Sequence, residues 1–147
     1  MKRLRRFLRL QSNERWLLIK AALLLEGIKL AMRLIPFKVL RRLADRAGRT
    51  FVRRRSRTNL PAQTVAWAVE TVSQNTPGEK TCLTQALAAQ VLLTRRGYSS
   101  LLHIGVVKDE NGELLAHAWV ECQNEIVVGG YELERYTLLT SLEGHSI

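Results

Sequence analysis

The chain has 147 residues, of which 46% are hydrophobic and 24% are charged. This length is typical of one domain, and the apolar content is enough for one core, which argues against a disordered chain. Three Pro, nine Gly and no repeating period argue against flexible linkers and a solenoid.

The net charge of +10 is concentrated in the first part of the chain. Residues 1–57 hold 18 Lys or Arg and three acidic residues, a net charge of +15, whereas the remainder is −5. Such a distribution favours contact with nucleic acid, anionic lipid or an acidic partner. Aromatic residues do not alternate with the basic run 53–57 as they do on surfaces that stack bases, so we do not expect nucleic acid.

Cys82 and Cys122 are too few for a disulfide framework, and they lack the close spacing of metal ligands. We therefore expect no metal or other cofactor, and the cytoplasm as the compartment. The basic start is followed by an apolar stretch with four charged residues, at positions 20, 26, 29 and 33, and with no small-residue cleavage site. This pattern excludes a secretory signal and a membrane-spanning helix.

Two helices are predicted in the basic part of the chain. The first covers 16–35 with Ser12 as its N-cap, and its broad apolar face can either cover the core or lie on a membrane surface. The second covers 37–48, because Pro36 suits a helix start and Gly48 a helix end. Residues 49–57 then form a basic connector.

Two further helices follow. The spacing of Val65, Val69 and Val72 predicts a helix over 62–74, which begins after Pro61 and ends at the turn 75–78. The next helix begins at residues 81–82 and ends at 95–97, where two Arg and a Gly suit a helix C-terminus.

From residue 98 the pattern is that of strands. Residues 101–107, 113–122 and 125–128 are predicted strands, joined by hairpin turns at 109–112 and 123–124. A helical half followed by a small antiparallel sheet is an α+β fold.

One cysteine and one histidine could form a catalytic pair. Cys82 lies at the start of its helix, where unpaired backbone N–H groups and the helix dipole stabilise a thiolate nucleophile and an oxyanion. His117, flanked by two alanines, could serve as its base from a strand. A buried structural cysteine and an ordinary strand histidine remain the alternatives.

We interpret His103 as a sheet residue and Cys122 as a small apolar residue. Trp119 could shield the pair from water or be a core aromatic.

Three segments carry a family resemblance. The string Thr81-Cys82-Leu83-Thr84-Gln85-Ala86-Leu87, then LLTRRGY, then LHIGVVKDENGELLAHAWVE resemble the transglutaminase-like peptidases of lasso-peptide biosynthesis, as does the basic helical opening. The resemblance implies a transglutaminase/papain-like cysteine peptidase core over 59–147. The basic helical region 1–58 would pack on this core within one globular unit.

The resemblance also implies an activity. Cys82 would attack the bond between leader and core of a ribosomally made precursor peptide, and His117 would take the thiol proton and later protonate the leaving amine. Short family members usually work with a separate leader-binding protein and an ATP-dependent macrolactam cyclase.

This chain departs from the family at the third member of the triad. The family has an Asp on the strand after the hairpin, whereas the aligned position here is Gly129. Glu125, Glu132 or Glu121 could replace it, although Glu121 would be about 13 Å from His117 along the strand. A backbone carbonyl, or a Cys–His dyad without a third residue, are the other possibilities.

Two alternative functions remain at this level. One is a transglutaminase-like acyltransferase that uses the same two residues. The other is a non-catalytic basic scaffold at an anionic membrane surface, and such a location on the inner face of the membrane is equally compatible with the peptidase.

Overall fold

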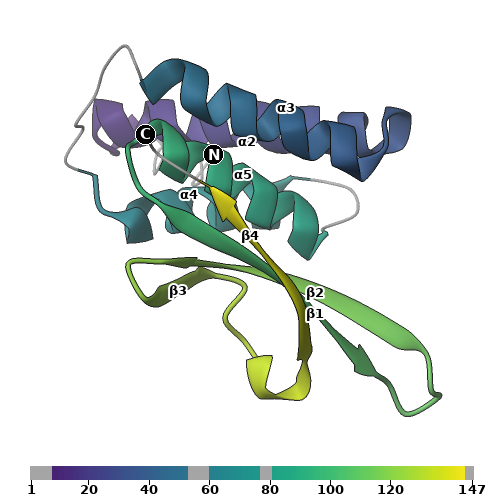
Figure 1. Ribbon diagram of the computed structural model, residues 1–147. Helices are drawn as coiled ribbons and strands as arrows, with labels where there is room; N and C mark the ends of the chain where they lie inside the picture. The colour runs from purple at the N-terminus through teal and green to yellow at the C-terminus, as the bar shows by residue number, and fades with distance from the viewer. Residues whose placement is uncertain (1–7, 53–59, 77–80, 145–147) are drawn as a thin grey trace.

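Figure 1 shows the computed structural model of the protein, which describes residues 8–52, 60–76 and 81–144, with the backbone alone for 49–52. Four described helices precede one antiparallel sheet. The predicted α+β arrangement is therefore confirmed.

Helix α2 spans Ser12–Leu34 and begins four residues before the predicted apolar stretch. Its N-cap is Gln11 and not Ser12. The backbone N–H of Gln11 donates to the side chain of Glu14 at 3.2 Å, as in a capping box. The N-cap therefore lies one residue earlier than predicted.

Helix α3 spans Phe37–Val52 and does not end at Gly48 as predicted. Gly48 is buried, and a Cβ atom at this position would lie 2.9 Å from the Thr94 side chain of another helix. The glycine thus serves close helix packing instead of a cap. The first residues of the predicted connector are helical, and residues 53–57 lie outside the described ranges.

Helix α4 spans Ala62–Asn75, and α5 spans Cys82–Arg95. Both agree with the prediction to within one residue. The backbone of Gly97 has φ +83°, the left-handed conformation expected after α5. Helix α5 is the central element because it packs on α2, α3, α4 and the sheet. Ten of its residues are accordingly buried, far more than one apolar face would require.

The described strands have the order β3-β2-β1-β4. Strands β1 (Ser100–Lys108), β2 (Leu114–Cys122) and β3 (Glu125–Val128) are the predicted ones. The turn between β2 and β3 has positive φ at Gln123 and Asn124, as the hairpin prediction requires. Strand β4 (Thr137–Gly144) was not predicted, and neither was the short 3-10 helix η1 (Leu133–Arg135) before it.

The elements form layers, with the sheet on one side and α2 and α3 on the other (Figure 1). The core extends through all of them, from Leu17 of α2 through Leu92 of α5 to Val120 of β2. Because side chains alternate along β2, His117 and Trp119 project from the opposite side of the strand to Ala118 and Val120, which belong to the core.

None of the described helices is both long enough and apolar enough to cross a lipid bilayer.

Candidate active site

Cys82 is the first residue of α5, and its position is fixed by the helix cap. The Thr81 side chain accepts a hydrogen bond from the backbone N–H of Thr84 at 3.2 Å, and the two threonine hydroxyls are also hydrogen-bonded. Thr84 is buried and contacts the sulfur of Met32 in α2. Cys82 is thereby held, half-buried, where the first-turn N–H groups of a helix have no partner within the helix.

The thiol of Cys82 faces strand β2. Its Sγ lies 3.9 Å from the carbonyl oxygen of Ala116, the residue that precedes His117. Cys82 therefore lies beside the strand that carries His117, although the two residues are 35 positions apart in the sequence. Among the described residues, the structure gives no hydrogen bond between the thiol and the imidazole.

His117 is buried and has a defined orientation. Its Nε2 atom lies 2.8 Å from the carbonyl oxygen of Gly129. Because a carbonyl oxygen can only accept, Nε2 carries the proton. In the neutral ring Nδ1 is then unprotonated, which makes it the atom that can accept a proton.

Gly129 presents this carbonyl because only glycine fits there. Its φ is +73°, and a Cβ atom would lie 2.8 Å from the carbonyl oxygen of Ala118 and 3.2 Å from Cβ of Trp119. The chain after β3 can therefore pass close to β2 and bring a backbone acceptor to the imidazole.

The three glutamates considered as third triad members have other partners. Glu121 accepts a hydrogen bond from Nε2 of His103 at 3.0 Å. Glu125 accepts one from Gln63 of α4 at 3.0 Å, and Glu132 is paired with Arg135 at 2.8 Å. The described acceptor of His117 is instead the Gly129 carbonyl.

Trp119 packs between two histidines. Its ring centroid is 5.5 Å from that of His103 and 6.0 Å from that of His117, and both pairs are stacked. The indole also lies over Gly105, where a Cβ atom would be 2.9 Å from the ring. Trp119 thus contacts the candidate base and lies outside the main core cluster.

His103 is a strand residue, as we interpreted it, and its ring is held from both sides. Nδ1 lies 2.8 Å from Oγ of Ser141 in β4, and Nε2 bonds Glu121 in β2. Three strands therefore hold one imidazole, which in turn supports Trp119. The sequence does not indicate this cluster, because it depends on the pairing of β1 with the unpredicted β4.

Two tyrosines complete the surroundings of His117. The ring centroid of Tyr131 is 5.4 Å away, and that of Tyr136 is 5.0 Å away. Partial desolvation raises the pKa of Tyr131, and the nearby Cys82, Glu70 and Tyr136 raise it further. Tyr131 is therefore a neutral hydroxyl near neutral pH, and its ring lies next to the candidate base.

Cys122 has a different environment from Cys82. It is buried, its Sγ donates to the carbonyl oxygen of Ser99 at 3.5 Å, and burial raises the pKa of its thiol. Within the described ranges, no three His, Cys, Asp or Glu side chains are grouped so that they could hold a metal ion.

The profile of the Transglutaminase-like superfamily matches residues 22–141. The chain belongs to the transglutaminase-like superfamily. Comparison with curated proteins and with solved structures gives no significant match.

The transglutaminase-like match begins inside α2 and ends inside β4, so it includes Cys82, His117 and Gly129. It confirms the broader part of the resemblance in the sequence. The superfamily is compatible with both a cysteine peptidase and an acyltransferase, and the lasso-peptide subtype stays a prediction.

Proposed function

We propose that this transglutaminase-like protein is a cysteine peptidase that removes the leader from a ribosomally made lasso-peptide precursor. Cys82 is the nucleophile and His117 the base. The observation that carries the proposal is the position of Cys82 at the start of α5, beside the strand of a histidine whose Nε2 is occupied by a backbone carbonyl. The resemblance of the Cys82 and His117 segments supplies the substrate class.

The mechanism follows from these positions. Nδ1 of His117 takes the thiol proton, and the Cys82 thiolate attacks the carbonyl carbon of the scissile peptide bond. Backbone N–H groups in the first turn of α5 stabilise the oxyanion. The imidazolium then protonates the leaving amine, and water hydrolyses the acyl-enzyme and restores the thiol.

The thiol and the imidazole must approach each other for the first proton transfer. Catalytic hydrogen bonds of unliganded enzymes are often long and tighten when substrate binds. The proposal is for a dyad whose imidazole is oriented by the Gly129 carbonyl. A separate leader-binding protein would present the precursor, and a macrolactam cyclase would use the freed core in the cytoplasm.

The decisive experiment is coexpression with a lasso-peptide precursor and a leader-binding protein, which we expect neighbouring genes to encode. We expect Cys82→Ala and His117→Ala each to abolish leader removal, with the circular dichroism spectrum of the folded protein retained. Cleavage at the wild-type rate by either folded variant would contradict the proposal. The matched control is Cys122→Ala, which should retain cleavage because Cys122 lies away from the site.

Mass spectrometry of the product separates hydrolysis from acyl transfer. Hydrolysis yields a core peptide and a leader whose combined mass exceeds that of the precursor by one water. An acyltransferase would instead join the acyl group to an amine. That product would support catalysis by Cys82 and His117 but would show an acyltransferase instead of a peptidase. No reaction in any of these assays would favour the non-catalytic scaffold.

A further inference from the structure

Helix α2 is apolar on two opposite sides. Its buried side includes Leu17, Ala21 and Leu25 and packs on the core. A second row of large apolar side chains is 40–73% exposed, and we call it the α2 stripe: Trp16, Ile19, Leu23, Leu30 and Leu34. At 3.6 residues per turn these five positions lie on one side of the helix, opposite the buried residues.

The α2 stripe is long and straight. From Trp16 to Leu34 it extends about 27 Å along one helix. Isolated exposed apolar residues are normal on protein surfaces, but five large ones on one side of a surface helix, with an interruption at Glu26 and Gly27, mark a contact site. The stripe lies on a layer far from the sheet, because α5 separates α2 from β1 and β2 (Figure 1).

Basic side chains lie next to the stripe on both sides. Arg15 and Arg33 each precede a stripe residue on one side of the helix, and Lys20 follows Ile19 on the other. The nearby carboxylate of Glu26 is neutralised by Lys29 at 2.8 Å.

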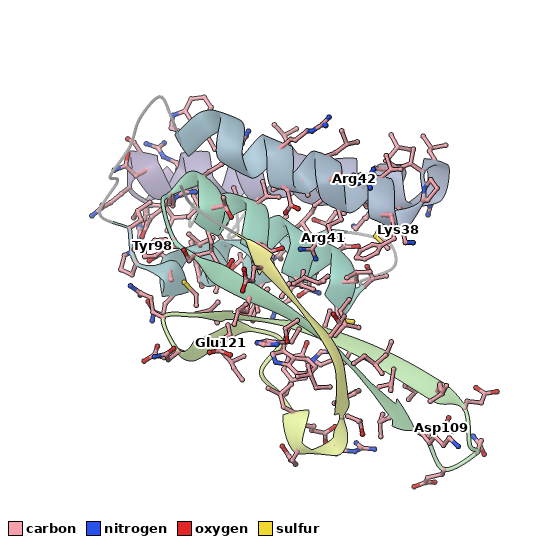
Figure 2. The ribbon with its side chains drawn as sticks, in the orientation of Figure 1. Lys38, Arg41, Arg42, Tyr98, Asp109 and Glu121 are labelled. Carbon is pink, nitrogen blue, oxygen red and sulfur yellow. The ribbon has the colours of Figure 1, made fainter. Side chains whose placement is uncertain are left out.

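The neighbouring helix adds to this positive charge. Figure 2 shows Lys38, Arg41 and Arg42 on α3, whereas Asp109 lies in the turn between β1 and β2 and Glu121 lies on β2. Lys38 and Arg42 are exposed. The layer that carries the apolar row is therefore the basic part of the molecule, within the segment of net charge +15.

We propose that the α2 stripe docks on an anionic lipid bilayer, with α2 lying in the plane of the surface. The apolar row would enter the boundary between headgroups and acyl chains, and the flanking cations would contact lipid phosphates. Trp16 at one end suits this boundary, where its indole has apolar and polar surroundings. This inference is independent of the proposed catalysis.

Charge favours lipid over a second copy of the chain. Two copies related by a twofold axis would bring like charges of two α2 helices together, which opposes association. An anionic bilayer complements both the charge and the straight shape of the α2 stripe.

Vesicle binding tests the proposal with the purified full-length chain. We would measure cosedimentation with vesicles of phosphatidylcholine alone and of phosphatidylcholine mixed with an equal amount of phosphatidylglycerol. We expect binding to the mixed vesicles only, weakened by salt. Leu23→Glu should reduce this binding at least about tenfold, because it places a charge in the apolar row. The matched control is Leu114→Glu, a similarly exposed leucine at the far end of the sheet, which should bind as wild type.

Tryptophan fluorescence gives a second readout. Binding should shift the emission to shorter wavelength. The shift should disappear in Trp16→Phe and persist in Trp67→Phe, because Trp67 lies on α4, outside the stripe.

Four results would overturn the proposal: no vesicle binding, equal binding to both vesicle types, equal loss in the two glutamate variants, or a wild-type dimer that Leu23→Glu dissociates. The last would assign the stripe to a second copy. Circular dichroism should show both glutamate variants folded, since the replaced side chains are exposed.

Discussion

Gly129 joins backbone conformation to the orientation of His117. We expect Gly129→Ala to lower the free energy of unfolding by more than the ~1–2 kcal/mol that positive φ costs an L-residue, because its Cβ would also meet the backbone of β2. Leader removal should fall at least about tenfold, since the displaced carbonyl no longer orients the imidazole. Chemical denaturation and a cleavage assay measure the two effects.

Gly112 provides the matched control for this substitution. Its φ is +79°, but no atom lies within 4 Å of a Cβ at this position. Gly112→Ala should therefore lose only the ~1–2 kcal/mol of backbone strain and keep wild-type cleavage. Equal cleavage by both variants would show that the Gly129 carbonyl has no part in catalysis.

The two cysteines should differ in reactivity. Cys82 is half-buried at a helix start, whereas burial raises the pKa of Cys122 and so lowers its thiolate fraction at any pH below that pKa. We expect iodoacetamide to alkylate Cys82 at least about tenfold faster near neutral pH. Peptide mapping after timed labelling measures this ratio. The fast reaction should vanish in Cys82→Ser and remain in Cys122→Ser, and a comparable rate at both cysteines would argue against an activated nucleophile.

At the residue scale, local signals in the sequence indicated the two proposed catalytic residues. The Thr81 cap and the change of period after Gly97 were enough to place Cys82 on a helix start and His117 on a strand. The contact between His103 and Glu121 was not predictable, because it depends on the exact register of β1 and β2, which pairs His103 with Trp119.

At the element scale, two helical glycines should respond in opposite directions to the same substitution. Gly27 of α2 has nothing within 4 Å of a Cβ, so Gly27→Ala should raise the free energy of unfolding by about 0.5–1 kcal/mol. Gly48→Ala in α3 should lower it, because the added methyl group meets Thr94 of α5. Urea unfolding of both variants measures the signs, and stabilisation by Gly48→Ala would mean that α3 and α5 can separate at no cost.

Elements with their own start and stop signals were predicted from the sequence, and those defined by pairing were not. Helix α5 has a threonine cap and a terminal glycine, and the hairpin of β2 and β3 has its turn residues. Strand β4 is exposed along most of its length, so it lacks the alternation of apolar and polar residues that identifies a half-buried strand. Its position comes from hydrogen bonding to β1 and from the Gln90 side chain, which donates to the carbonyl of Leu142 at 3.0 Å.

At the scale of the whole molecule, the basic helices and the sheet share one core and should unfold together. Leu17→Ala should cost about 2–5 kcal/mol, because this leucine is fully buried in α2. Helical circular dichroism and tryptophan emission should then fall in one transition at a lower temperature. The control is Leu23→Ala on the same helix, which should change stability by less than about 0.5 kcal/mol because its side chain is 71% exposed. Two separate transitions would show that α2 and the sheet are independent units.

For the chain as a whole, the fold class was easier to predict from the sequence than the surface that contacts other molecules. Apolar periods and turn residues predicted the order of helices and strands. They could not predict which apolar residues of α2 pack on the core and which remain exposed, because residues of the same type occur on both sides of the helix.

The hydrogen bond from His117 to the carbonyl of Gly129 has a further consequence for how the site could change during evolution. A side-chain acceptor can be lost by one base change in its own codon, and a carboxylate also loses its charge in acid. A main-chain carbonyl is present whatever residue occupies the position, and it does not titrate. What must be conserved is the left-handed backbone conformation that directs this carbonyl toward His117. Selection would therefore act on Gly129, a residue without a side-chain functional group.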